Sequence, residues 1–107
     1  MAYKIVWTAD ARKQRTAQLI YCLRVWGPKT AQRFRTSLNS HAALLSSSPG
    51  IGKREPLLLH RTRHLYRSLV VHKHFKLVYY IDEAANTLYI VALWDTRREP
   101  LRQADAT

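Results

Sequence analysis

Residues 65–82, LYRSLVVHKHFKLVYYID, decide the fold of this chain of 107 residues. Both halves of the stretch are rich in β-branched, aromatic and long aliphatic residues, and the basic run His72-Lys73-His74 separates them. This pattern is typical of two strands joined by a short turn. The turn lacks Gly and Asn, so we expect a looser connection than the tight types that need positive φ. A third strand, Thr87 to Trp94, follows the turn-forming residues 82–86 and completes a meander.

The first quarter of the chain predicts a short strand followed by a helix. Tyr3 to Trp7 is rich in strand formers, and the Thr8 hydroxyl can cap a helix that runs to about Trp26. Leu19, Leu23 and Trp26 recur at helical spacing in this segment. That spacing predicts that one face of the helix is buried.

A second helix follows at once, because Gly27-Pro28 interrupts the first and proline suits the first position of a new helix. It carries an apolar stripe of Ala31, Phe34, Leu38, Ala42 and Leu45 and ends before Ser46-Ser47-Ser48-Pro49-Gly50. The predicted class is α+β with the order β-α-α-β-β-β, in which a helical hairpin packs on one face of a single, mainly antiparallel four-stranded sheet. We expect residues 1–107 to form one domain, with an ordered core of about residues 3–100.

Charge is the strongest feature of the composition. The formal net charge is +11 and the isoelectric point is about 10.4, which predicts an anionic partner, either nucleic acid or an acidic protein segment. High solubility alone is the alternative explanation. The single cysteine, Cys22, excludes an internal disulfide and favours a reducing compartment. No apolar run approaches the roughly 20 residues that span a bilayer, and the N-terminus lacks a signal-peptide core, so we expect a cytoplasmic protein without a membrane partner.

The segment from Pro49 to His64 is basic, and its residues 57–59 are three leucines that need apolar cover. It is either a contact surface or a solvated connection that the leucines hold in place. Cations that we predict to contact nucleic acid or a protein partner are Lys53, Arg54, Arg61, Arg63, Lys73 and Arg98.

Alternation along the strands predicts which side chains lie on the sheet face that the helices leave open. The more apolar set, Phe75, Leu77, Tyr79 and Ile81, should face the helices, which leaves Lys76, Val78 and Tyr80 on the other side. Placing Arg67 and Lys76 together on the open face avoids burying a charge under the helices. The open face is therefore the predicted site.

These features resemble the RelE/ParE superfamily of bacterial type II toxins. The resemblance rests on the order of elements, on the meander from Tyr66-Arg67 to Tyr79, and on the tail Leu93-Trp94-Asp95-Thr96-Arg97-Arg98-Glu99-Pro100. Residues 3–8, Gly27-Pro28 and Ser48-Pro49-Gly50 are similar to it too, so the resemblance spans roughly residues 3 to 100. It implies a stress or plasmid-maintenance toxin that a cognate antitoxin neutralises in an oligomeric complex, with an acidic segment wrapped around the basic surface.

The superfamily has two activities, and both stay open at this stage. RelE-like members cleave mRNA in the ribosomal A site, whereas ParE-like members bind and poison DNA gyrase. Matching the RelE-like pattern without a gap implies site cations at Arg67, Lys76 and Arg97. Leu69 stands where a second basic residue is expected, and Tyr89 is the last tyrosine of the chain, so the tyrosine expected after the last arginine is missing. Ribosome-dependent mRNA cleavage is the main hypothesis, and gyrase inhibition is the alternative.

RNA cleavage without a metal needs a base, an acid and fixed cations for the developing phosphate charge. Arg67, Lys76 and Arg97 supply the cations, and His74 in the turn or Tyr80 on the open face is the predicted acid or base. The alternatives are solubility for the turn histidines, cross-strand packing for Tyr80, and phosphate or antitoxin contact without chemistry for the cations. We expect neither a metal nor a cofactor, since the chain has no glycine-rich phosphate loop and no Cys or carboxylate lies beside the histidine pair of residues 60 and 64.

Overall fold

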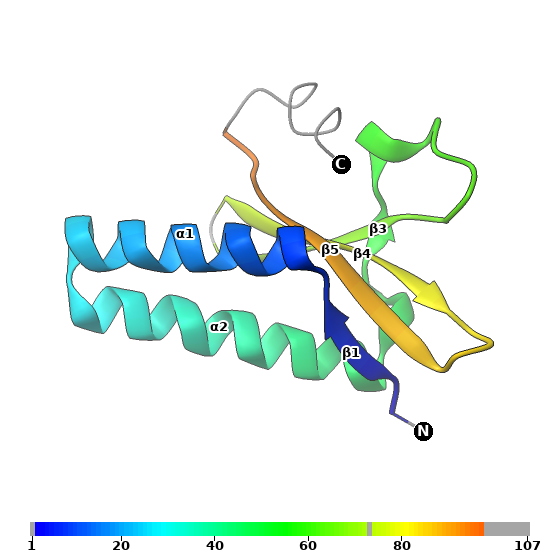
Figure 1. Ribbon diagram of the computed structural model, residues 1–107, viewed down its shortest axis with the longest axis horizontal. Helices are drawn as coiled ribbons and strands as arrows, with labels where there is room; N and C mark the ends of the chain where they lie inside the picture. Colours follow the sequence, from blue (N-terminus) through cyan, green and yellow to red (C-terminus); the bar gives the residue numbers. More distant parts are fainter. Residues whose placement is uncertain (1, 73, 98–107) are drawn as a thin grey trace.

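The computed structural model describes residues 2–72 and 74–97 and confirms the α+β class. Two helices pack on one mixed, mostly antiparallel sheet (Figure 1). The elements are β1 (Lys4–Trp7), α1 (Ala9–Trp26), α2 (Pro28–Ser47), β2 (Lys53–Arg54), β3 (Arg67–His72), β4 (Phe75–Asp82) and β5 (Thr87–Asp95). Short 3-10 helices, η1 (Pro49–Ile51) and η2 (Pro56–Leu58), flank β2. The sheet has five strands rather than the predicted four, because β2 adds to the edge of β3.

The predicted helix boundaries are confirmed by their caps. The Thr8 hydroxyl accepts a hydrogen bond from the Ala11 amide at 3.3 Å, which satisfies a free donor in the first turn of α1. Gly27 has φ 93°, a backbone conformation that residues with a side chain rarely adopt. Its amide donates to the Cys22 and Leu23 carbonyls. Pro28 then begins α2, so the helices meet at one residue.

The strand order in the sheet is β1-β5-β4-β3-β2. β1 runs parallel to β5, and every other neighbouring pair is antiparallel. In the register of β4 and β5, Tyr80 lies opposite Tyr89 and Lys76 lies opposite Trp94. The β3–β4 register shifts between Val70 and His72, beside the turn for which we predicted a looser connection.

The main core lies between the helices and one face of the sheet. Its strand residues include Phe75, Leu77 and Tyr79, as alternation predicted, and Ile81 packs partly against it. The α2 stripe lies on the other side of this core, where the Phe34 and Phe75 rings are 5.0 Å apart. Phe34, Leu38, Ala42 and Leu45 are all buried, which confirms the helical spacing from which they were predicted.

The prediction of a buried face along α1 holds at Leu19, which packs partly against the main core, and is wrong at the end of the helix. Leu23 and Trp26 are 50% and 66% exposed, and Ile20, Tyr21 and Val25 are exposed as well. The hairpin of α1 and α2 extends beyond the edge of the sheet, so its free end has no strand to pack against (Figure 1). Within the described part of the chain, neither helix is long and apolar enough to cross a membrane.

We predicted that the second face of the sheet is open, and this prediction is wrong for a large part of the face. The segment 49–66 folds over it, and Leu58 packs with Val78, Ala92 and Trp94 in a second buried cluster. Leu57 and Tyr66 lie partly buried against the same cluster. Leu57 and Leu58 thus find apolar cover on this face, whereas Leu59 is exposed, and only part of the face stays accessible.

Candidate functional site

Lys76, one of the three predicted site cations, is neutralised by an ion pair. Its ammonium forms an ion pair with the carboxylate of Glu55, which is fully buried, and also lies 5.3 Å from the centre of the Trp94 ring. The other Glu55 oxygen accepts from the Leu57 amide at 2.8 Å and caps η2. A buried carboxylate requires such partners, because burying an unpaired charge is costly. Lys76 therefore anchors the segment 49–66 to the sheet.

Arg67 lies on the other face of the sheet from Lys76, so the expectation that the two share the open face is wrong. Arg67 is opposite Tyr79, whose side chain belongs to the core under the helices. Lys76 and Tyr79 are three positions apart on β4, and an odd separation places side chains on opposite faces. The Arg67 guanidinium donates to the Gly52 carbonyl at 2.9 Å, which spares it the cost of unpaired burial at this position.

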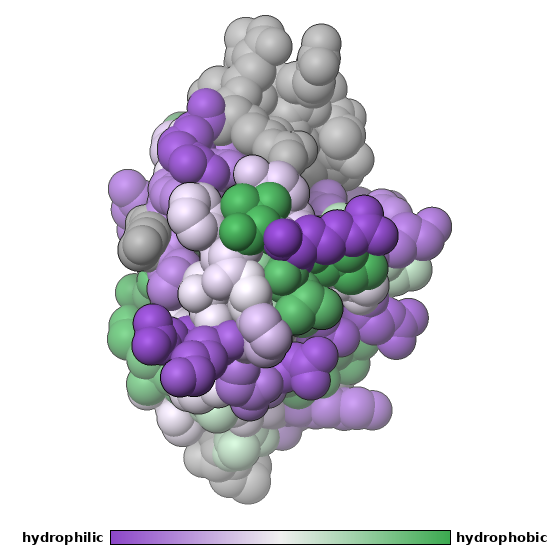
Figure 2. Space-filling view, turned by 90° about the vertical axis from the view of Figure 1, so that its left-hand side faces the viewer, coloured by the Kyte–Doolittle hydropathy of each residue, from purple (hydrophilic) through white to green (hydrophobic). Residues whose placement is uncertain are grey.

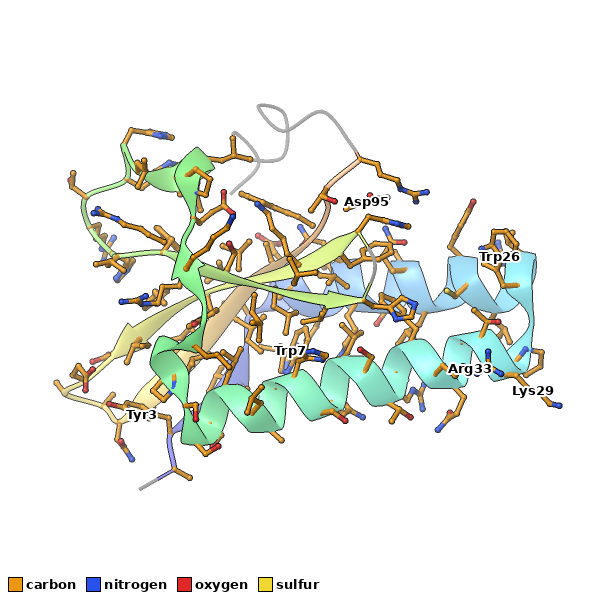
Figure 3. All side chains as sticks on the ribbon, turned by 180° about the vertical axis from the view of Figure 1, so that it is seen from behind. Tyr3, Trp7, Trp26, Lys29, Arg33 and Asp95 are labelled. Atoms are coloured by element: carbon orange, nitrogen blue, oxygen red, sulfur yellow. The ribbon has the colours of Figure 1, made fainter. Side chains whose placement is uncertain are left out.

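Arg97 is paired within its own segment. Its side-chain nitrogens donate to both oxygens of Asp95 at 3.2 and 3.1 Å, and its amide donates at 2.9 Å (the position of Asp95 is labelled in Figure 3). Burial would raise the pKa of Asp95, but the hydrogen bonds and charge of Arg97, together with the charge of His74, outweigh burial and lower that pKa. The hydrogen bond with Asp95 raises the pKa of Arg97, and Tyr21 of α1 adds to this effect. Asp95 is opposite Phe75 of the main core, so its carboxylate, which holds Arg97, lies on the helical side of the sheet.

The predicted acid–base candidates are separated as well. The His74 ring packs on Phe75 at 4.7 Å, and the His74 carbonyl accepts from the Thr96 amide, so the residue lies at the β3–β4 turn. Tyr80 lies on the second face, four positions along β4 from Lys76. Burial raises the pKa of Tyr80, and so do its neighbours Tyr89, Tyr66 and Asp82, whereas Arg63 lowers it. The structure therefore places neither candidate beside Arg67, and only His74 lies close to the Asp95–Arg97 pair, where its charge helps to lower the pKa of Asp95.

An aromatic cluster surrounds Tyr80, and sequence reasoning missed it. It consists of His64, Tyr66, Tyr80 and Tyr89, all half-buried on the second face of the sheet. The His64 and Tyr80 rings are stacked 3.8 Å apart at 11°, and the Tyr80 and Tyr89 rings are 5.2 Å apart at 26°. Tyr66 meets His64 and Tyr80 edge-on at 5.9 and 5.7 Å. Pairing of Tyr80 with Tyr89 across adjacent strands could have indicated part of the cluster from the sequence. Nothing in the sequence indicated that the loop containing His64 folds onto Tyr80.

The predicted contact cations lie mostly in the segment that crosses this face. Lys53, Arg54 and Arg63 are exposed, and Arg61 is partly exposed. Lys53 and Arg54 form the short edge strand β2. Two further predicted contacts, Lys73 and Arg98, lie outside the described residues. Among the described residues, no three His, Cys, Asp or Glu side chains are grouped so that they could hold a metal ion.

A second surface lies at the free end of the helical hairpin. Figure 2 views this end and shows hydrophobic side chains exposed between hydrophilic ones. We define the hairpin tip as Leu23, Val25, Trp26, Lys29 and Arg33, of which Trp26, Lys29 and Arg33 are labelled in Figure 3. A groove of about 370 Å³ runs beside it between the helices, lined by Leu19, Ile20, Leu23, Pro28, Ala31 and Arg35 among others.

Comparisons with known proteins agree on one group. A family model described as "ParE toxin of type II toxin-antitoxin system, parDE" matches residues 5–100. A solved structure titled "Chromosomal ParDE TA system from P. aeruginosa" superposes with a TM-score of 0.65 at 15% identity, over 86% of this chain and 94% of that one. At this identity the likeness concerns the fold alone. No curated protein matches the sequence.

Proposed function

The chain belongs to the ParE toxin family of type II toxin–antitoxin systems, and on this premise we propose that it arrests growth by binding DNA gyrase. It is the toxin of a ParDE system, which implies a cognate ParD antitoxin as its partner. In the RelE/ParE superfamily, the ParE-like members poison gyrase and the RelE-like members cut mRNA on the ribosome. The ParE match therefore favours gyrase inhibition over the ribosome-dependent mRNA cleavage that was our main hypothesis.

The placement of the predicted site cations is the observation that carries this proposal. Metal-free RNA cleavage needs cations, an acid and a base arranged around one phosphate. Here Lys76 is paired with the buried Glu55, Arg67 projects from the other face of the sheet, and Arg97 is paired with Asp95. Such a scattered set can contact an anionic partner, but it does not converge on one scissile phosphate.

The hairpin tip is the surface that we propose for the contact with gyrase. Its apolar side chains are exposed at the end of α1, and Lys29 and Arg33 lie on the start of α2 at the same end of the hairpin (Figure 3). Interface residues that contribute most to binding are often Trp, Tyr and Arg, because they combine large apolar area with directed polar contacts. An exposed apolar surface rimmed by charge is also typical of a protein contact rather than of a solvated end.

The second proposed contact is with the antitoxin. The cations Lys53 and Arg54 are exposed on the edge strand β2 and Arg63 on the loop before β3, and the net charge of +11 favours an acidic protein segment there. The two proposed surfaces belong to different parts of the fold, the helical hairpin and the segment after it. Variants of each surface can therefore be compared directly.

Two assays on the same purified toxin test the proposal. We expect inhibition of gyrase supercoiling with accumulation of gyrase-dependent DNA breaks, and intact mRNA by primer extension in a translating lysate. Trp26→Ala should weaken gyrase inhibition about tenfold, the loss expected when a hot-spot side chain is removed. Arg54→Ala, at an exposed residue outside the tip, is the matched control and should inhibit gyrase like the wild type. Ribosome-dependent mRNA cuts with unimpaired supercoiling would contradict the proposal.

A further inference from the structure

The aromatic cluster occupies the part of the second sheet face that the segment 49–66 leaves accessible. Val78, Ala92 and Trp94 are buried beneath Leu58, whereas the four rings of the cluster stay half-exposed. Rings whose only role was to fill a core would be enclosed like the buried Trp94. The four rings are instead partly exposed as a group, and an exposed aromatic group is a surface against which another planar group can pack.

The existing His64–Tyr80 contact shows what kind of group fits. Two planar rings lie 3.8 Å apart and 11° from parallel, a geometry in which π-faces are in contact. His64 belongs to the loop between η2 and β3, so this ring is brought in from outside the sheet. A nucleobase is a planar heteroaromatic ring as well, and every base offers such a face.

The charges around the cluster define how a strand would run. Arg63 is exposed in the same loop, and its charge acts on Tyr80. Arg61 lies two residues away, and the carboxylate of Asp82, two positions after Tyr80 on β4, acts on Tyr80 in the opposite sense to Arg63. A phosphate backbone is attracted to the Arg61–Arg63 side and repelled from Asp82. Stacking rings beside guanidinium groups are the combination that single-stranded nucleic acids bind.

We propose that His64, Tyr66, Tyr80 and Tyr89 form a stacking site for unpaired bases of single-stranded nucleic acid, with Arg63 contacting the phosphate backbone. This site does not depend on gyrase being the target of the toxin. It is a binding site and involves no cleavage of the strand. Stacking makes binding depend on the presence of bases, whereas a basic surface alone would bind any polyanion of equal charge.

The test compares two strands of about 12 nucleotides by fluorescence anisotropy with the full-length toxin: oligothymidylate, and a strand of equal length whose sugars carry no bases. We expect the toxin to prefer the base-bearing strand by about tenfold. Tyr80→Leu combined with Tyr89→Leu should remove this preference and leave the affinity for the abasic strand unchanged. Tyr21→Leu, at an exposed tyrosine of α1, is the matched control and should keep the full preference.

Circular dichroism and thermal melting establish that each variant is folded, and Tyr89→Leu alone carries the test if the double variant melts at a lower temperature. Oligouridylate identifies the source of the strand: equal binding supports a site that accepts either nucleic acid, and tighter binding of one supports a site selective for it. Equal affinity of the wild type for both test strands, or no affinity for either, overturns the proposal. So does a preference that survives in the tyrosine variants. Loss of antitoxin binding in those variants, with no effect on oligothymidylate, would make the cluster a protein contact and overturn it too.

Discussion

Lys76 and Glu55 form an ion pair that joins the middle of the sheet to the segment crossing it. Glu55 is completely buried, and the Lys76 side chain is 14% exposed. The pair explains why a lysine can occupy a largely covered face of β4. It also removes Lys76 from the set of free cations that a phosphate could bind.

Lys76→Met should destabilise the fold by about 3 to 5 kcal/mol, because it leaves the Glu55 carboxylate buried without its partner. Combining it with Glu55→Gln should cost less than Lys76→Met alone, since a neutral amide tolerates burial better than an unpaired charge. Urea unfolding of the three proteins measures these differences. Lys53→Met, at an exposed position, is the control and should change the unfolding free energy by less than about 0.5 kcal/mol. A similarly small change for Lys76→Met would show that the pair does not anchor the segment.

Tyr79→Phe should cost about 1 to 3 kcal/mol, the range for leaving buried hydrogen-bonding groups without a partner. The Tyr79 hydroxyl donates to the Pro49 carbonyl at 2.7 Å and accepts from the Gly52 amide at 3.0 Å. Chemical denaturation of the variant measures the loss. A variant as stable as the wild type would mean that other contacts hold the start of the segment 49–66.

Gly52→Ala should destabilise the protein, because a Cβ at this position would lie 2.5 Å from the Tyr79 hydroxyl oxygen and 2.7 Å from the Ser68 carbonyl oxygen. Gly50→Ala is the matched control, since nothing lies within 4 Å of a Cβ at that position. Melting temperatures of the two variants compare the effects. Equal melting temperatures would contradict the close approach of Gly52 to Tyr79.

Phe34→Ala should cost about 3 to 5 kcal/mol, as expected for a large side chain removed from a packed core. Trp26→Ala should change stability by less than about 0.5 kcal/mol, although tryptophan is larger. The difference follows from exposure, which is 1% for Phe34 and 66% for Trp26. Guanidinium unfolding of both variants checks it, and a large loss for Trp26→Ala would mean that the end of α1 is packed in solution.

Acid should weaken the fold through Asp95. The folded state holds the pKa of Asp95 below its ordinary value of 3.8, so the stabilisation is complete above about pH 4 and is lost as the pH falls through the lower folded pKa. Arg97→Gln removes the group that contributes most to lowering this pKa, beside a smaller contribution from His74, and should reduce the loss between about pH 4 and pH 2. The measurement is the melting temperature of the wild type and of the variant across this pH range, each compared with its own value at neutral pH. An identical acid profile in the variant would exclude Arg97 as the cause.

Arg67→Ala combined with Arg97→Ala should leave growth arrest intact if the toxin acts on gyrase. The two guanidinium groups hydrogen-bond to Gly52 and Asp95, so their removal alters stability rather than a shared catalytic centre. Colony counts after induction measure the arrest, with the soluble toxin quantified in parallel. A folded variant that no longer arrests growth would show that these arginines take part in the toxic activity.

The local elements could be predicted from the sequence because their signals are local. The Thr8 cap, the Gly27-Pro28 break and the α2 stripe each depend on residues within a few positions of one another. Alternation identified Phe75 and Leu77 as core residues for the same reason. These patterns also carried the resemblance to the RelE/ParE superfamily, which the ParE family match supports.

The sequence by itself therefore determined the helices, the meander and the family. The tertiary structure decided on which face of the sheet each side chain lies and which distant residues it contacts. Strand register placed Arg67 and Lys76 on opposite faces, and the path of the segment 49–66 brought Glu55 to Lys76 across 21 positions. The same path assembled the aromatic cluster, and the length of the hairpin relative to the sheet left Trp26 exposed. Local propensity and periodicity act within one element, but burial and charge pairing depend on how distant elements pack.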